Sequence, residues 1–561
     1  MRTLETDVLV IGAGGAGMYS ALAAAAHGAS VILADRSLIG RGGATVMAQM
    51  TVAGALGGGD VGSHHADTLE AGRGLCDPEL VELLCSDAAD VIAQMEQWGA
   101  GWAREADGAY KFVNAPGHAV PRCVYVEFLA TGVAVSRTLR TQLVRNERVR
   151  RIGELMVIDA LVVNGICAGA LALHLPTGQP VVLRARATVL ATGGLTRLYA
   201  RNSASANMGG DGYSLALRAG AELVDMEFVQ FFPIGHLAPR LVGMDPIMWD
   251  AFRYKLGGRL LNGQLEEFVQ HYGEASDRYT LTRDQATYAI TREVEAGRGS
   301  PHGGAWLSFT HCTEGALREA FGPIIDRLAR NGIDLTRQMV EVAPIAHYHM
   351  GGVRVDSSMA TRVAGLFAAG EAVGGANGAN RLSGNAVTEA LVFGRRAGES
   401  AAAFARAAPR DLDVGAAAES AAALLQCDDT TRAIANPAAL IAELQQLMTR
   451  EVGPFRDASN LQRALERIRA MRALIGLRPP SSATGFDTVL LDWLDLRGML
   501  ETAEVVTLSA LERTESRGAH QRLDFPGLDP GWGVNLVAAA DGGSTRLRRH
   551  PIAMPSKERV Q

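Results

Sequence analysis

Lysine is almost absent from this chain of 561 residues. Lys111, Lys255 and Lys557 are the only lysines among 54 basic residues. Arginine is therefore the default cation, and a single arginine is weak evidence of function. The net charge is -6 and no basic or acidic block occurs, which argues against nucleic acid as a partner.

Cysteine is also scarce. The six cysteines form no CxxC or comparable cluster, so the usual spacing of Fe–S or zinc ligands is missing and we expect no metal site. Scattered, reduced thiols suit a cytoplasmic compartment. Glu5 and Asp7 precede the first apolar run, unlike a secretory leader. Without a run of about 18 uninterrupted apolar residues, we expect membrane contact only through a partner subunit.

Apolar residues make up 48% of the chain and charged residues 20%, as in globular proteins. This length exceeds what one hydrophobic core organises, so we expect two to four domains. Apolar residues at three- and four-residue spacing within 437–475 predict two amphipathic helices. A helical bundle explains them more simply than a partner-binding or membrane surface. The pattern also predicts helices at 211–224 and from 385 onward, and a hairpin around 541–543.

The first 35 residues follow the order strand, glycine turn, helix, strand. In "GAGGAG", Gly12 permits the tight turn, Gly14 lets a pyrophosphate approach the backbone, and Gly17 lets the helix pack closely on the strand. Asp35 ends the second strand, 18 residues after Gly17, where a carboxylate can bind a ribose hydroxyl. A strand, a glycine turn, a helix and a second strand that ends in an acidic residue follow one another at the expected spacing. This pattern predicts a dinucleotide-binding site.

Segments far downstream favour FAD over a nicotinamide dinucleotide. "ATGG" ends a later buried strand at Gly194, and "GLFAAGE" leads to Glu371 more than 300 residues after the glycine turn. A nicotinamide-binding Rossmann domain is normally contiguous, whereas chains that return late to the dinucleotide domain are typical of FAD folds. We therefore predict FAD as the cofactor.

The sequence resembles the flavoprotein subunits of succinate dehydrogenase and fumarate reductase, with their relatives L-aspartate oxidase and adenylylsulfate reductase. Matching segments, in family order over almost the whole chain, are "GAGGAG", "TVMAQ", "ATGG", "GGDGYSLALRAGAELVDMEFVQFFP", "TRDQATYAITREVEAGRG", "AHYHMGGVRV", "GLFAAGEAVGGANGANRLSGNA" and "ESRGAHQRLDFP". The resemblance implies an α/β fold: a discontinuous Rossmann-like FAD-binding domain (1–235 and 346–410), an inserted capping domain (236–345), a C-terminal helical domain (411–525) and a tail (526–561).

The resemblance also implies which residues hold FAD. The matched positions are Gly12, Gly14, Gly15, Gly17, Asp35, Gly43, Ala44, Thr45, Gln49, Gly193, Asp211, Glu371, Asn385, Ala386 and Val387. The last three open a helix whose N-terminus would stabilise negative charge at the flavin C2 carbonyl. Members of membrane complexes carry a flavin-linked histidine where this chain has Ala44, which predicts non-covalent FAD and poor oxidation of succinate.

Four residues match the catalytic positions of the family: Arg283, Asp250, His347 and Arg381. Arg283 would exchange a proton with one carbon of a C=C bond, with Asp250 as its relay, although a surface ion pair with Asp284 is the simpler explanation outside the family context. His347 and Arg381 would bind one substrate carboxylate. Their alternatives are a core histidine and an arginine bound to the backbone of a turn. His349 has no matching support, and a metal pair with His347 would lack further ligands.

The other side of the expected substrate pocket departs from the family. Phe232 replaces a carboxylate-binding histidine, Trp249 a threonine and Asn377 another histidine. A second substrate carboxylate would stay unpaired, which is costly in a buried site. We therefore predict an enoate with an apolar or aromatic second half, while His236 could restore a donor and keeps fumarate or aspartate open.

Three rival functions remain: an oxidase of the L-aspartate oxidase type, chemistry like that of adenylylsulfate reductase, and an electron-transfer or scaffold subunit. The resemblance also leaves open that a separate iron–sulfur subunit is a partner of this chain. Arg517 and His520, in "SRGAHQRLDFP", match a family signature near the domain junction, for which we favour a structural role.

Overall fold

The computed structural model describes residues 1–127, 129–241, 247–249, 256–272, 283–409, 412–427, 436–481 and 484–552, with the side chains of 283–285 left out. The chain forms two compact units. Unit 1 comprises Met1–Ala200, Ala204–Val229 and Tyr348–Gln561, and unit 2 comprises Arg201–Ser203 and Gln230–His347.

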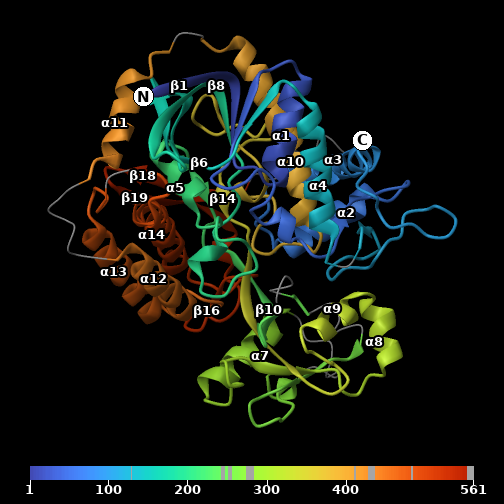
Figure 1. The fold of residues 1–561 in the computed structure, drawn as a ribbon. Helices are drawn as coiled ribbons and strands as arrows, with labels where there is room; N and C mark the ends of the chain where they lie inside the picture. The colour runs from blue at the N-terminus through green and yellow to red at the C-terminus, as the bar shows by residue number, and fades with distance from the viewer. Residues whose placement is uncertain are drawn as a thin grey trace. The chain divides into compact units, whose positions relative to one another are not determined.

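A seven-stranded sheet is the centre of unit 1 (Figure 1). Its main path runs β5-β2-β1-β8-β7-β6, and β15 adds to β8. The neighbours of β1 and β2 are parallel, whereas β6, β7 and β8 pair antiparallel. Val8, Leu9 and Val10 of β1 are fully buried, as expected for a strand covered on both faces. The strands are β1 (Arg2–Ile11), β2 (Val31–Ala34), β5 (Val149–Ile152), β6 (Leu155–Val163), β7 (Ile166–His174), β8 (Gln179–Leu190) and β15 (Leu366–Ala368).

Helices α1 (Gly15–Ala26) and α10 (Asn385–Ala407) lie side by side against this sheet (Figure 1). They approach so closely that a Cβ added at Gly394 would lie 2.7 Å from the carbonyl oxygen of Ala16. The Ser20 hydroxyl donates to the Gly394 carbonyl at 2.9 Å. Two glycines, Gly394 and Gly398, and the alanine-rich α1 therefore bring together segments almost 400 residues apart.

The remaining helices of unit 1 flank the sheet or form the C-terminal helical part. They are α2 (Val61–Ala71), α3 (Pro78–Gln97), α4 (Thr131–Arg145), α5 (Asp211–Arg218), α11 (Gly415–Ala422), α12 (Pro437–Glu451), α13 (Ala458–Ile475) and α14 (Thr488–Glu512). The helix predicted for 211–224 is shorter in the structure. Gly220, at φ +93°, ends it in the left-handed region that favours glycine, and Leu223–Val224 form strand β9.

A four-stranded sheet in unit 1 joins the strands near the C-terminal end to two short strands from earlier in the chain. Its order is β14-β9-β18-β19, with β14 at Gly352–Val353, β18 at Val534–Asp541 and β19 at Ser544–Pro551. β18 and β19 form the hairpin predicted around 541–543, and β18 pairs Val537 with Val224 of β9. Two short pairs complete unit 1: β3 (Val52–Ala53) with β4 (Cys123–Val124), and β16 (Phe455–Arg456) with β17 (Gln521–Arg522).

Unit 2 is built on a four-stranded sheet in the order β10-β13-β12-β11. The strands are β10 (Val229–Ala238), β11 (Arg259–Leu261), β12 (Ala305–Ser308) and β13 (Val340–His349). The chain enters this unit along β10 and leaves it along β13. Its described helices are α7 (Arg283–Glu295), α8 (Glu314–Phe321) and α9 (Ile324–Arg330).

Candidate functional site

The glycine turn at the start of α1 has the shape that a bound pyrophosphate requires. Gly12 has φ +99°, and a Cβ there would overlap the carbonyl of Ala191. At Gly14 the nearest atom to an added Cβ is Thr45 Oγ1, 3.9 Å away, so this backbone is open. Gly14 caps α1 without a side-chain hydrogen bond, whereas α3 and α12 are capped by Asp77 and Asn436. The Gly15 N–H donates to Thr45 Oγ1, and the N–H groups that follow at this helix end fit a phosphate.

Asp35 follows β2, as predicted, and both of its oxygens are already hydrogen-bonded. The Ala13 N–H donates to Oδ2 at 2.6 Å, and the Ser37 N–H and hydroxyl donate to Oδ1, each at 2.7 Å. Asp35 thus links the glycine turn to the loop that follows β2. A carboxylate oxygen can accept more than one hydrogen bond, so ribose binding remains compatible with these contacts.

The loop 42–50 contains Gly43, Ala44, Thr45 and Gln49, and every residue in it is half-buried. The Gly15 N–H donates to Thr45 Oγ1 at 3.0 Å, and the Gly43 N–H donates to Ser205 Oγ at 2.8 Å. The loop is therefore held against the glycine turn from one side and against the segment before α5 from the other.

Gly193 and Asp211 border the same region. Gly193 has φ +74°, and an added Cβ would lie 2.6 Å from Met208 Sδ, so only glycine fits. Burial raises the pKa of Asp211, although the Arg36 guanidinium lowers it. Arg36 itself donates to both oxygens of Asp495 in α14, at 2.5 and 2.9 Å.

Glu371 is a buried carboxyl group against the second glycine segment. Its Oε1 accepts the His349 N–H at 3.1 Å, and its side chain occupies the space that a Cβ at Gly194 would need. Burial raises the pKa of Glu371 to about 8, opposed by that hydrogen bond. A protonated carboxyl group can donate a hydrogen bond, which suits a contact with a ribityl hydroxyl.

The N-terminus of α10 begins at Asn385, Ala386 and Val387. Its cap is Gly384 at φ +86°, without a side-chain hydrogen bond, so this end can also face negative charge. The Asn385 side chain points elsewhere: its Oδ1 accepts from His64 Nε2 at 2.9 Å and its Nδ2 donates to Thr68 Oγ1 at 3.1 Å. Asn385 therefore positions the helix end through α2.

His347 ends unit 2 in the sequence and is only partly buried. Its Nδ1 lies 2.7 Å from Ser203 Oγ, a hydrogen bond whose direction depends on the tautomer. The Phe232 ring and the imidazole form a T-shaped pair, with centroids 5.3 Å apart and planes at 65°. Within unit 2, an aromatic ring thus accompanies the histidine predicted to bind a carboxylate.

His236 and Trp249 engage each other. The Trp249 indole N–H donates to His236 Nδ1 at 3.1 Å, and His236 Nε2 therefore carries the proton and donates to the Pro239 carbonyl at 2.5 Å. Both ring nitrogens are used, which removes the donor that His236 could have restored. Trp249 is fully buried and packs near Phe309 and Phe321, so its ring belongs to the core of unit 2.

Arg381 is 7% exposed, and its guanidinium lies 4.4 Å from the centre of the Tyr348 ring. It also donates from Nη1 to the Leu382 carbonyl at 3.3 Å. The Tyr348 hydroxyl donates to Glu389 Oε2 at 2.6 Å, and Asn377 Nδ2 donates to the same oxygen at 2.7 Å. Asn377, predicted to line the substrate pocket, is 2% exposed and belongs to this buried cluster.

His349 is a core histidine, not a partner of His347. It is fully buried, its Nδ1 lies 3.0 Å from the Tyr213 hydroxyl, and its Nε2 lies 3.1 Å from the Met226 carbonyl. Burial lowers its pKa to about 3. Among the residues that the structure describes, no group of three His, Cys, Asp or Glu side chains could hold a metal ion.

Two catalytic predictions cannot be placed. Asp250 lies outside the described residues. Arg283 begins α7, but its side chain lies outside them as well.

Within the described ranges, no helix is long and apolar enough to cross a membrane.

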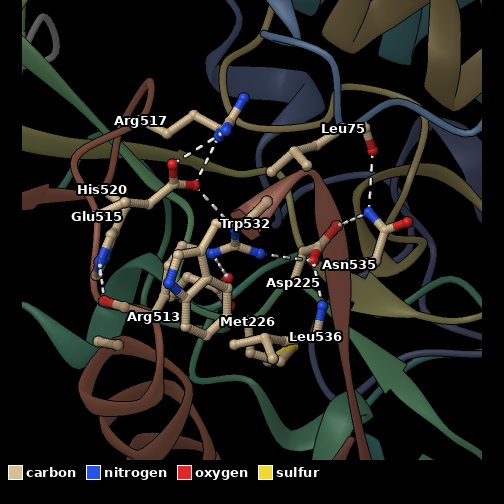
Figure 2. A network of polar contacts seen from close by, with 12 residues as sticks. Leu75, Asp225, Met226, Arg513, Glu515, Arg517, His520, Trp532, Asn535 and Leu536 are labelled. Atoms are coloured by element: carbon tan, nitrogen blue, oxygen red, sulfur yellow. Dashed lines mark hydrogen bonds and ion pairs between the residues drawn. The ribbon is translucent and has the colours of Figure 1, made fainter. Parts of the chain in front are cut away.

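The C-terminal signature forms a buried polar network in unit 1 (Figure 2). Arg513 is fully buried and donates to Glu227 at 2.5 Å and to Glu515 at 3.1 Å. Arg517 donates to Glu515 at 2.6 Å, and His520 Nε2 lies 3.2 Å from the Arg513 carbonyl. These contacts are those of a structural network.

The same network reaches earlier segments of unit 1, at Asp225 and Leu75 (Figure 2). Asn535 Nδ2 donates to Asp225 Oδ2 at 2.5 Å and to the Leu75 carbonyl at 3.0 Å. Arg517 Nη1 donates to the Arg73 carbonyl at 2.7 Å. The C-terminal segment is thereby tied to the loop between α2 and α3.

The parallel strands, the open glycine turn and the uncapped α10 define a dinucleotide-binding flavoprotein. An FAD binding domain model matches residues 7–387, and a fumarate reductase flavoprotein C-terminal model matches residues 441–559. The chain belongs to the fumarate reductase and succinate dehydrogenase flavoprotein family. It is an FAD-dependent oxidoreductase acting on CH–CH groups, as the sequence predicted.

Individual relatives match over nearly the full length. A fumarate reductase (CoM/CoB) subunit of Methanothermobacter marburgensis is 36% identical over 95% of this chain and 97% of its own. L-aspartate oxidase of Caulobacter vibrioides is 34% identical over 97% and 98%. The structure of Mycobacterium smegmatis Sdh1 in complex with UQ1 is 33% identical, covers 99% of this chain and 96% of its own, and has a TM-score of 0.90.

Three residues of these clusters escaped the sequence analysis: Ser203, Tyr348 and Glu389. Tyr348 stands inside the histidine motif, and its position between two histidines was the available signal. Ser203 contacts His347 across 144 residues, and Glu389 lies on an apolar face of α10. For these two residues, only the folded chain shows the partner.

Proposed function

We propose that this flavoprotein reduces the C=C bond of an enoate whose second half is apolar or aromatic. The observation that carries the proposal is the surroundings of His347 in unit 2. The Phe232 ring packs against the imidazole in a T-shaped pair, and both ring nitrogens of His236 are hydrogen-bonded, to Trp249 and to Pro239. A second substrate carboxylate would meet aromatic side chains there, and an unpaired buried charge is costly.

The residues would divide the reaction as follows. Arg381 and His347 bind the single carboxylate, and their positive charge and hydrogen bonds favour electron density that moves toward it. FAD, held by the glycine turn before α1 and by the N-terminus of α10, would supply a hydride to one carbon of the double bond when bound in its reduced form. Arg283, with Asp250 as its relay, gives a proton to the other carbon, so the products are the saturated acid and oxidised flavin.

The proposal is tested by reoxidation of the flavin. The purified holoenzyme is reduced anaerobically and mixed with trans-cinnamate, crotonate or fumarate, and the return of flavin absorbance is recorded. We expect cinnamate and crotonate to reoxidise it faster than fumarate. Arg381→Gln should abolish the response, while Arg337→Gln, at an exposed residue of unit 2, should not. Fastest reoxidation by fumarate would overturn the proposal.

We propose that FAD is bound without a covalent link, since Ala44 has no side-chain nucleophile. Acid precipitation of the holoenzyme is expected to leave all flavin in the supernatant. Flavin retained in the washed pellet would contradict this. Ala44→His keeps the loop and introduces a side chain able to form such a link, and flavin in its pellet would show that the assay detects one.

Amine oxidation is the second candidate, because an L-aspartate oxidase matches the chain at 34% identity. Peroxide formation with L-aspartate in air would favour it over enoate reduction.

We also propose that a separate iron–sulfur subunit donates the electrons, since the Methanothermobacter relative is named as one subunit of its enzyme. Unchanged electron transfer in Arg283→Ala would instead favour a role limited to electron transfer.

A further inference from the structure

A fully buried carboxyl group, that of Glu389 in α10, lies in the cluster with Arg381. Its Oε2 accepts two hydrogen bonds, from the Tyr348 hydroxyl at 2.6 Å and from Asn377 Nδ2 at 2.7 Å. Its Oε1 has no hydrogen-bond partner within the part of the chain that the structure describes. A buried carboxylate normally has all its oxygens paired, so this half-paired group favours the protonated form.

The electrostatics around Glu389 agree with that geometry. Burial raises its pKa to about 7, although the hydrogen bonds from Tyr348 and Asn377 and the charge of Arg381 lower it. The titratable groups that face it are Glu371 from the segment after β15, Tyr213 from α5 and Tyr348 from β13. Burial raises the pKa of both tyrosines well above 10, and that of Glu371 to about 8. Glu389 therefore gains charge near pH 7, well before either tyrosine does.

Glu389 is linked to Arg381 through one aromatic ring. Tyr348 gives its hydroxyl hydrogen to the carboxyl group, and its ring face lies 4.4 Å from the guanidinium carbon. Contact between a guanidinium and an aromatic face is attractive and directional. A change at Glu389 therefore reaches the guanidinium both through the orientation of Tyr348 and through charge.

We propose that Glu389 is a positioning residue whose carboxyl group fixes Tyr348 and Asn377 around Arg381 and whose ionisation weakens the hold of Arg381 on a substrate carboxylate. This inference rests on the proposed function, because it takes Arg381 as the carboxylate-binding residue. With Glu389 neutral, no carboxylate charge at this position opposes the attraction between Arg381 and an anionic ligand. With Glu389 ionised, a second carboxylate competes for the same cation.

The test measures the affinity of the oxidised holoenzyme for trans-cinnamate between pH 6 and pH 9, followed by the change in flavin absorbance. Oxidised flavin cannot reduce the probe, so binding is isolated from turnover. For the wild type, we expect the dissociation constant to rise with pH around 7, by up to roughly tenfold, the factor of one pKa unit. In Glu389→Gln it should stay at the low-pH value throughout.

A second variant makes a directional prediction. Tyr348→Phe keeps the ring beside Arg381 but removes the hydrogen bond that stabilises the Glu389 carboxylate. The dissociation constant should therefore begin to rise at a higher pH than in the wild type. If Glu389→Gln does not retain FAD, Tyr348→Phe alone tests the proposal. Glu399→Gln, ten residues further along α10, is the matched control and should behave as the wild type does.

The outcomes separate the two ideas. The positioning role is overturned if the dissociation constant of the wild type does not change near pH 7. It is also overturned if the same change persists in Glu389→Gln and Tyr348→Phe. Either result leaves the proposed function intact. No binding of trans-cinnamate, crotonate or fumarate to the wild type at any pH overturns the proposed function and the positioning role with it.

Discussion

His347 has two neighbours of opposite kind within unit 2, and each leads to a different experiment. Ser203 forms a hydrogen bond with Nδ1 at 2.7 Å, which fixes the orientation of the ring. Phe232 contributes an aromatic ring in a T-shaped contact. Orientation and specificity at this histidine therefore depend on separate side chains.

Removal of the Ser203 hydroxyl should loosen the imidazole without removing it. We expect Ser203→Ala to raise KM for the preferred enoate about threefold to tenfold, the effect of one lost hydrogen bond, with FAD content unchanged. Steady-state kinetics at several pH values would check this. Thr336→Ala, in an exposed turn of unit 2, is the control. A KM equal to that of the wild type would show that Ser203 does not orient His347.

Phe232 is predicted to decide between one and two carboxylates. Phe232→His places a donor where the aromatic ring now lies, so binding of fumarate should improve relative to cinnamate. The ratio of kcat/KM for the two acids measures this, and we expect it to move toward fumarate by about tenfold or more, the order of one charge-assisted hydrogen bond. A ratio unchanged from the wild type would remove Phe232 from the specificity determinants.

Between elements, the contact of α1 with α10 depends on the absence of side chains. A Cβ at Gly398 would overlap the Ser20 carbonyl, so Gly398→Ala should destabilise the protein by about 1–3 kcal/mol through overpacking. Gly315→Ala in α8 is the matched control, because a Cβ there meets no atom within 4 Å and alanine favours a helix. Denaturant titration should show opposite signs, and equal effects would contradict the packing argument.

The elements that sequence predicted best are those whose signals are local. The glycine turn, the Ala-rich α1 and the long α10 each carry their pattern within about 25 residues, and strand, turn and helix periodicity is a local property. The end of α5 at Gly220 could have been predicted, because a glycine that ends a helix is a local signal. Strand β9 was missed because it forms only through pairing with β14 and β18, far along the chain. The Glu389 cluster was missed for the same reason: Tyr348 and Asn377 reach it only in the fold.

Across the whole molecule, buried titratable groups set the pH range of stability. Burial raises the pKa values of Asp225, Glu371 and Glu389 to about 7, 8 and 7. These groups hold their protons more tightly in the folded chain than in the unfolded one, so they lower stability as pH rises from about 4 toward 8. Burial lowers the pKa values of His64 and His349 to about 4 and 3. These histidines lower stability as pH falls below about 6.5.

The two sets oppose each other between about pH 4 and 6.5. Of the groups named here, the three carboxyl groups dominate above that range, so stability should decline from pH 6.5 to 8. Glu371 alone would account for about 2 kcal/mol of that loss, one proton over one and a half pH units. Urea titration of the wild type and of Glu371→Gln at both pH values would measure it. The variant should lose about 2 kcal/mol less than the wild type, while Glu419→Gln, at an exposed residue of α11, should keep the full decline. A slope unaltered by Glu371→Gln would mean that this carboxyl group is already ionised at pH 6.5, and the decline would then have to come from Asp225 and Glu389.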